Sequence, residues 1–241
     1  MQARLHPHFQ RWLSRNVESH RIDGYAIVSL SLKSPQQAPG DINDVLLEQV
    51  ADLAEQYSYS EVRTTQQQNL ILADVKKSDL FQLWLDASRI NLATPTSGTL
   101  ADIVCCPGGD YCSLANARSL PLSAAIQQRF DDLDYLYDLG TLSFRISGCV
   151  NACAHHHIAN IGILGVEKNG QEFYQITLGG DDGNQARLGR RLGPSLPMEQ
   201  IPDAIEKILQ LYQQQRSDQD ETFLETFLRI GLAAFKEQVY G

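Results

Sequence analysis

The chain has 241 residues, 43% of them hydrophobic, and a formal net charge of −9 from 29 acidic and 20 basic side chains. This length and apolar content suffice for one large domain or two small ones with a packed core. The acidic balance argues against broad nucleic-acid binding, which usually needs a basic stripe. No apolar run approaches the roughly 18 residues of a membrane span. The N-terminal segment MQARLHPHFQRWLSRNVESH lacks the apolar stretch of a secretory signal, so we expect a cytoplasmic protein whose thiols stay reduced.

The first part of the chain predicts a small α+β unit. Residues 6–17 carry apolar side chains at helical spacing, and residues 24–32 alternate as a strand does. A helix is predicted over residues 40–57, with Asp41 or Asn43 as its N-cap. Its apolar stripe is formed by Val45, Leu46, Val50, Leu53 and Ala54. Two strand-like runs and a second helix follow at 60–65, 69–75 and 76–90, an order typical of a ferredoxin-like unit over about residues 20–90.

The second part of the chain differs in composition. A segment rich in Thr, Ser, Pro and Gly at residues 93–100 is the best linker candidate, and we place two domains at 1–95 and 96–241. Three strand-like runs then occur at 141–147, 159–166 and 172–180, with a turn signal at Asn169-Gly170. Two closing helices are predicted at 198–216 and 221–239.

All five cysteines lie in this second part, and four of them form two pairs. Cys106 and Cys112 have the spacing C-x5-C, and Cys149 and Cys153 have the spacing C-x3-C. Two such pairs suit a [4Fe-4S] cluster, in which each of four irons takes one thiolate. Structural zinc is the main competitor, but its cysteine pairs are usually tighter than a C-x5-C loop containing Pro-Gly-Gly. Buried thiols unrelated to any metal are the third interpretation.

The sequence around these cysteines resembles a known family. The stretches CPGGDYCSLANARS and SGCVNACAHHHIANIGILG, with RWLSRNV, GYAIVSLSL and EVRTTQQQNLIL upstream, resemble the C-terminal half of the siroheme-dependent nitrite and sulfite reductases. The resemblance runs from about Phe9 to the end of the chain. It implies an α+β fold, in which a ferredoxin-like half-domain precedes an α/β iron–sulfur and siroheme domain. It also implies six-electron reduction of sulfite to sulfide or of nitrite to ammonia, with a [4Fe-4S] cluster and siroheme as cofactors.

The family's cysteine motifs carry over residue by residue. Cys106, Cys112, Cys149 and Cys153 would bind the cluster, and Cys153 would also be the axial ligand of the siroheme iron and so the catalytic cysteine. A bridging thiolate joins the electron store to the reacting iron without a gap. Cys105 has no place in the motif, and we expect a small buried residue that ends a strand.

Three further residues are candidates for cofactor binding by resemblance. Asn151 matches an Asn of the family motif close to siroheme and cluster, although a turn or N-cap is the alternative. Arg63 falls in an R-x-T motif, and a surface arginine is the alternative. Arg118, expected on a helix, could reach a siroheme carboxylate or form a solvated ion pair.

Three other features have simpler interpretations beside the functional ones. The consecutive histidines 155–157 cannot all face one ion, so the alternatives are direct ligation by one of them, a hydrogen bond from one of them to a ligand or a propionate, or neither. The basic stretch 188–193 is either a carboxylate-binding loop or an exposed turn. We assign four aromatic residues to core packing, namely Trp12, Trp84, Phe173 and Tyr174.

The chain departs from the family in length. Family members are usually about twice as long, and much of their basic pocket for siroheme and substrate comes from the other half. We therefore expect a C-terminal part of a reductase, either a fragment or a separately encoded half, that works with an N-terminal half. A flavoprotein or a ferredoxin would donate the electrons. The alternative is a noncatalytic iron–sulfur or zinc module for electron transfer or binding.

Overall fold

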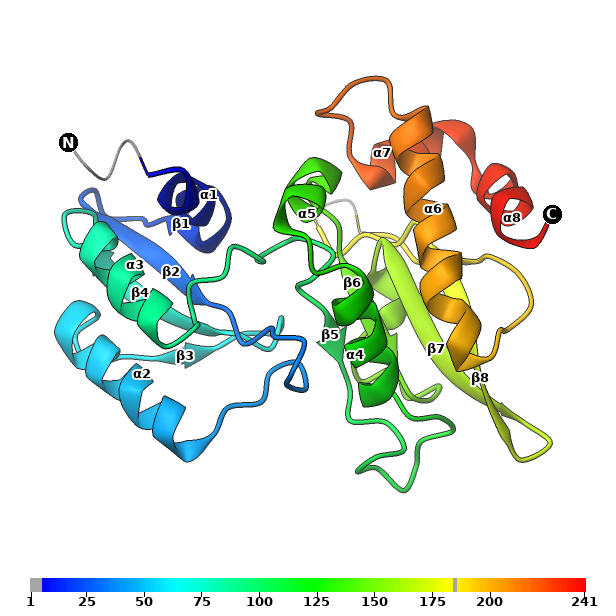
Figure 1. Ribbon diagram of the computed structural model, residues 1–241, viewed down its shortest axis with the longest axis horizontal. Helices are drawn as coiled ribbons and strands as arrows, with labels where there is room; N and C mark the ends of the chain where they lie inside the picture. Colours follow the sequence, from blue (N-terminus) through cyan, green and yellow to red (C-terminus); the bar gives the residue numbers. More distant parts are fainter. Residues whose placement is uncertain (1–5, 184–185) are drawn as a thin grey trace. The chain divides into compact units, whose positions relative to one another are not determined.

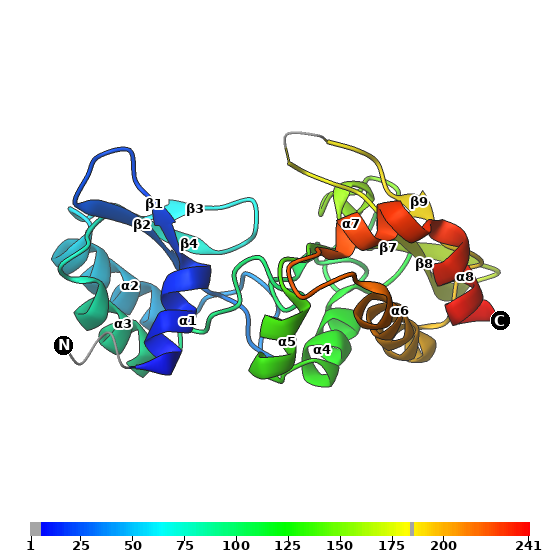
Figure 2. The same ribbon diagram turned by 90° about the horizontal axis from the view of Figure 1, so that it is seen from above.

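The computed structural model describes residues 6–183 and 186–241 and divides into two compact units between Ser97 and Gly98. Figures 1 and 2 show two perpendicular views. In the described ranges, no helix is long and apolar enough to cross a membrane.

The first unit is an antiparallel sheet with helices on one face (Figure 2). The strand order is β1-β2-β4-β3. Its elements are α1 (Pro7–Asn16), β1 (Val17–Ser19), β2 (Tyr25–Leu30), α2 (Asp44–Tyr57), β3 (Arg63–Thr64), β4 (Leu70–Lys76) and α3 (Leu80–Arg89). The predicted order strand, helix, strand, strand, helix is confirmed from β2 onward. Trp12 and Trp84 are buried in its core, as expected.

The first turn of helix α2 shows which of the two predicted residues is the N-cap. The Asn43 side chain accepts a hydrogen bond from the Leu46 amide at 2.7 Å, so Asn43 is the cap. The expectation that Val45 belongs to the apolar stripe is wrong, because its side chain is 63% exposed. Val45 lies five residues before the buried Val50, which turns it about 140° around the helix, away from the buried face.

Replacing Asn43 by alanine is expected to lower the free energy of unfolding by about 1 kcal/mol, because an amide of the first turn loses its acceptor. Asp41→Ala is the matched control, since Asp41 does not cap the helix, and it should change stability by less than about 0.5 kcal/mol. Urea denaturation of both variants measures the difference. Equal losses would place the cap elsewhere.

The second unit is built on a mixed sheet of order β5-β6-β7-β8-β9. Its strands are β5 (Val104–Cys105), β6 (Phe144–Ser147), β7 (Ile161–Lys168), β8 (Gln171–Leu178) and β9 (Arg190–Arg191). Strands β5, β6 and β7 are parallel, and the remaining pairs are antiparallel. Asn169 and Gly170 join β7 to β8 with φ values of 53° and 77°, as the hairpin signal predicts.

Helices cover the apolar face of this sheet, with α4 and α6 side by side in both views (Figures 1 and 2). The helices are α4 (Leu120–Arg129), α5 (Leu133–Leu139), α6 (Ile201–Gln215), α7 (Phe223–Ile230) and α8 (Leu232–Tyr240), with short 3-10 turns η2 (His156–Ile158) and η3 (Met198–Gln200). Phe144, Ile146, Ile163 and Ile176 contribute to the core beneath them.

Two expectations for this part need correction. The segment 221–239 is two helices, because Gly231 adopts φ 82° and ψ 164° between them. Phe173 is only half-buried beside the Lys168 ammonium, whereas Tyr174 is fully buried as expected. The boundary between the two units, Ser97 to Gly98, falls within the predicted linker 93–100, and the ends of that segment belong to the two cores, Ala93 to the first and Leu100 to the second.

Candidate iron–sulfur site

The two cysteine pairs follow neighbouring parallel strands. Strand β5 ends at Cys105 and β6 at Ser147, and Cys105 lies opposite Ile146 in the register. The carboxyl ends of parallel neighbours lie at the same edge of a sheet, so the loops after them start side by side. We call residues 106–119 the first cysteine loop and residues 148–160 the second.

Direct hydrogen bonds join the two loops. The Gly148 amide donates to the Cys106 Sγ at 3.1 Å. The Gly148 carbonyl accepts from the amides of Asn116 and Ala117 at 2.9 and 3.0 Å. The Ser119 hydroxyl lies 3.6 Å from the same Cys106 sulfur. Gly148 of the second cysteine loop is therefore hydrogen-bonded to both the start and the end of the first cysteine loop.

Glycines make this contact possible. A Cβ on Gly148 would lie 2.6 Å from the Ala117 carbonyl oxygen and 2.8 Å from the Gly108 Cα. Gly108 has a φ of +58°, and a Cβ there would lie 1.9 Å from the Ser119 hydroxyl oxygen. Sequence analysis missed Gly148 and Ser119, although a glycine directly before Cys149 was a usable signal of close backbone approach.

The four cysteines of the motif differ in exposure. Cys149 is buried, Cys106 and Cys112 are half-buried, and Cys153 is exposed. Ala152 and His155, on either side of Cys153, have positive φ values of 53° and 54°. Left-handed backbone at non-glycine residues costs energy and is concentrated at functional sites. The second loop therefore presents Cys153 outward in a strained conformation.

The cysteine loops have two features that suit cluster binding. In the part of the chain that the structure describes, no group of three or more His, Cys, Asp or Glu is placed to hold one metal ion, so the four cysteines are not drawn together as a single-ion site. The amide directed at the Cys106 sulfur and the side-chain-free backbone at Gly108 and Gly148 are features that cluster loops need.

Three other site candidates, Cys105, Asn151 and Arg118, lie at or beside the two cysteine loops. Cys105 is 2% exposed at the end of β5, as expected. Asn151 is an exposed turn residue between Cys149 and Cys153. Arg118 precedes α4 and is not on a helix as expected, because it forms a β-bridge with Gly108.

The two arginines each have a carboxylate partner. The Arg118 Nε donates to Glu172 at 3.3 Å, and the Tyr174 hydroxyl donates to the Arg118 carbonyl at 2.6 Å. Arg63, in the first unit, is exposed and pairs with Glu61. The alternatives that we gave are therefore both present, a solvated ion pair for Arg118 and a surface arginine for Arg63.

The histidines 155–157 point in different ways, as the geometry argument requires. His155 is exposed, while His156 is buried in η2 and its Nδ1 has no hydrogen-bond partner within the described residues. Burial lowers the pKa of His156 to about 4, and the neighbouring His157 adds to the effect.

His156 should make stability depend on pH. The unfolded chain binds a proton here below about pH 6.5, but the folded chain does so only near 4, so the free energy of unfolding falls as the pH falls through this window. We expect a loss of about 1 kcal/mol between pH 7 and 5.5 from this group. His156→Gln should remove that slope in urea denaturation, whereas the exposed His8→Gln should retain it. An unchanged slope in His156→Gln would contradict this assignment.

The chain matches two family models over most of its length. Residues 97–241 match the nitrite and sulphite reductase 4Fe-4S domain, and residues 22–87 match the nitrite/sulfite reductase ferredoxin-like half domain. The α+β fold that we expected, a ferredoxin-like half-domain followed by the iron–sulfur domain, is thereby confirmed.

The curated relatives that match this chain are named as sulfite reductases or nitrite reductases. A Sulfite reductase [ferredoxin] 1 of Mycolicibacterium paratuberculosis is 30% identical over 87% of this chain and 40% of its own length. A Ferredoxin--nitrite reductase of Synechococcus elongatus is 31% identical over 68% of this chain and 32% of its own length. This chain thus spans less than half of those proteins. A sulfite reductase of assimilatory type from Nitratidesulfovibrio vulgaris, 23% identical, is matched over 93% of its length.

Solved structures show the same fold. The Mycobacterium tuberculosis NirA protein aligns with a TM-score of 0.73 over 92% of this chain and 41% of its own, at 24% identity. The family models and the named reductases imply a [4Fe-4S] cluster and siroheme as cofactors. By the match of its larger domain, the chain belongs to the nitrite and sulfite reductase family.

Proposed function

We propose that this chain carries the cluster-binding part of a siroheme-dependent reductase, which reduces sulfite to sulfide or nitrite to ammonia with six electrons. Cys106, Cys112, Cys149 and Cys153 are the proposed cluster ligands. The observation that carries the proposal is the hydrogen-bonded contact between the two cysteine loops through Gly148.

Cys153 is the proposed ligand shared with the siroheme iron. It is exposed, whereas Cys149 is buried, so the second loop offers its last thiolate to a group outside the unit. When bound, siroheme supplies the iron that binds the anion, and the cluster supplies electrons to it.

The chain's other residues position these groups. The Gly148 amide donates to the Cys106 sulfur, and hydrogen bonds to ligand sulfurs are among the levers that tune cluster potential. We propose that Asn151, Arg118 and Arg63 face the cofactors. Arg118 would then exchange its exposed pairing with Glu172 for a siroheme carboxylate, an exchange that costs little because water screens an exposed ion pair.

The proposed partners follow from the relatives' names and from the chain's charge. Ferredoxin is named as the partner of two relatives and NAD(P)H in a third, so a ferredoxin or a flavoprotein is the proposed donor. The net charge of −9 does not suit a complete site for siroheme's carboxylates and a substrate anion, so we propose an N-terminal half as the source of the missing basic residues. The five free thiols fit the cytoplasm, a reducing compartment.

The test is anaerobic reconstitution of the chain with iron, sulfide and siroheme, alone and mixed with the N-terminal half of a related reductase. Reduced methyl viologen then serves as donor, and sulfide or ammonia is measured. We expect siroheme retention and turnover to rise on mixing, and both to fall in Cys153→Ser.

Two outcomes oppose the proposal. Iron–sulfur absorption without siroheme binding in either sample would favour the noncatalytic module. A colourless chain that takes up zinc instead of iron would contradict the reductase and favour the zinc form of that module.

A further inference from the structure

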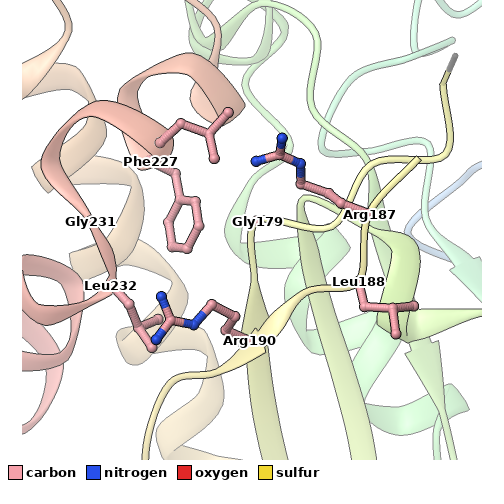
Figure 3. Close-up of a pocket in the computed structure, with 8 residues that line it drawn as sticks. Gly179, Arg187, Leu188, Arg190, Phe227, Gly231 and Leu232 are labelled. Atoms are coloured by element: carbon pink, nitrogen blue, oxygen red, sulfur yellow. The ribbon is translucent and has the colours of Figure 1, made fainter. Parts of the chain in front are cut away.

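A pocket of about 370 Å³ in the second unit is lined by residues outside the two cysteine loops (Figure 3). It lies between the β8–β9 connection and the α7–α8 junction, with Arg187 and Arg190 on one side and Phe227, Leu228 and Leu232 on the other. Leu178 at the end of β8 pairs with Ile161, and Ile161 pairs with Phe144 at the start of β6. The pocket thus lies at the amino end of β6, away from the carboxyl ends of β5 and β6 at which the cysteine loops begin. The last residue of the second cysteine loop, Asn160, returns to this end of the sheet and accepts the Gly179 amide at 2.9 Å.

The two arginines have no acidic partner in the described ranges 6–183 and 186–241. The two nearby acids of the same hairpin form other side-chain contacts. Asp182 pairs with Arg145 at 2.5 Å, and the Arg145 side chain is only 5% exposed. Asp181 lies opposite Arg187 in an antiparallel β-bridge, but its carboxylate accepts the Gly183 amide at 2.9 Å and forms no ion pair with the Arg187 guanidinium. Within the described residues, the pocket therefore has two guanidinium groups that form no ion pair.

Two helix ends meet at the same pocket. Gly231 is both the C-cap of α7 and the N-cap of α8, and it lines the pocket together with Leu232. The carbonyl end of α7 and the amide end of α8 carry partial charges of opposite sign, so the positive character of the pocket comes from its two arginines.

The opposite wall is apolar and fixed in place. The Phe227 ring packs directly on Gly179, where a Cβ would lie 2.0 Å from the ring. Leu228 and Leu188 are 49% and 67% exposed at the rim. An inorganic oxyanion would not use such a wall, but the apolar body of an organic anion would.

We propose that this pocket binds a small organic carboxylate, with the carboxylate between Arg187 and Arg190 and its apolar body against Phe227 and Leu232. Guanidinium groups bind carboxylates with two parallel hydrogen bonds, and both guanidiniums extend toward the α7–α8 side in Figure 3. The volume lies within the range of small-molecule sites. This assigns a carboxylate-binding role to part of the basic stretch 188–193.

The test is ligand-observed saturation-transfer NMR on the full chain with phenylacetate as the probe. We expect transfer to the phenyl ring with millimolar affinity, weakened about tenfold in Arg187→Gln and in Arg190→Gln. Arg191→Gln is the matched control, because Arg191 is exposed on the same strand but does not line the pocket. Its affinity should equal that of the unchanged chain. The readout does not involve reductase activity.

Two competing compounds test the charge and the apolar body of the ligand separately. Neither 2-phenylethanol, which lacks the charge, nor inorganic phosphate, which lacks the apolar body, should displace phenylacetate at equal concentration. Displacement by the alcohol would mean that the pocket recognises only the apolar body. Displacement by phosphate would mean that it recognises any oxyanion. Either result, or an equal loss of affinity in Arg191→Gln, overturns the assignment.

Discussion

Replacing Cys106 by serine is expected to reduce the iron content of the anaerobically reconstituted chain from about four irons to less than one. The physical reason is that each thiolate of the proposed site binds a separate iron, so one missing sulfur leaves one corner of the cluster without a ligand. Cys106 also receives the Gly148 amide at 3.1 Å, so it contacts the second cysteine loop directly. Iron and acid-labile sulfide assays, together with the absorption spectrum, measure the loss.

Cys105→Ser is the control next to it in the chain. The Cys105 side chain is 2% exposed at the end of β5, and its thiol donates to the Cys106 carbonyl at 3.2 Å, a contact that a serine hydroxyl can replace. Its cluster content should match that of the unchanged chain. If Cys105→Ser lost the cluster and Cys106→Ser kept it, Cys105 instead of Cys106 would be the cluster ligand.

Replacing Gly148 by alanine is expected to cost both stability and cluster. The added methyl would lie 2.6 Å from the Ala117 carbonyl oxygen and 2.8 Å from the Gly108 Cα, and neither backbone atom can move without separating the two cysteine loops. Overpacking of this kind costs about 2–3 kcal/mol of unfolding free energy. Because the loops hold Cys106 and Cys149, we also expect at least half of the iron to be lost on reconstitution. Urea denaturation and iron assay check the two effects.

Gly170→Asn separates this steric effect from the general cost of changing a glycine. Gly170 has a φ of 77° in the β7–β8 turn, and a Cβ there would meet no atom within 4 Å. Asparagine tolerates such a left-handed conformation. The substitution should cost less than about 1 kcal/mol and leave the cluster intact. A Gly148→Ala chain with normal iron content would contradict the role that we give to the contact between the loops.

Local patterns predicted most of the secondary structure, and long-range pairing limited the rest. The apolar stripe of α2 and the Asn169-Gly170 turn were legible because they depend on neighbours in sequence. The break at Gly231 was missed because an isolated glycine within a helical pattern is often tolerated. The parallel pairing of β5, β6 and β7 is not encoded in any short stretch, since β5 and β6 consist of only two and four residues.

Cysteine spacing and resemblance predicted the four candidate ligands. They did not predict the contacts that hold the two cysteine loops together. Spacing could not show that Cys106 and Gly148 would lie in hydrogen-bond contact, because that depends on β5 and β6 being neighbours. Arg118 was misplaced on a helix because α4 begins only at Leu120, after a bridge to Gly108 that no sequence pattern signals. The buried histidine, His156, was not distinguishable from its two neighbours by sequence alone.

The metal and sulfide content of the purified, anaerobically reconstituted chain tests the central claim most directly. Four thiolates in two adjoining loops predict about four irons and four acid-labile sulfides per chain, all lost in Cys149→Ser. One zinc per chain, or iron without labile sulfide, would contradict the assignment of Cys106, Cys112, Cys149 and Cys153 as the ligands of a [4Fe-4S] cluster.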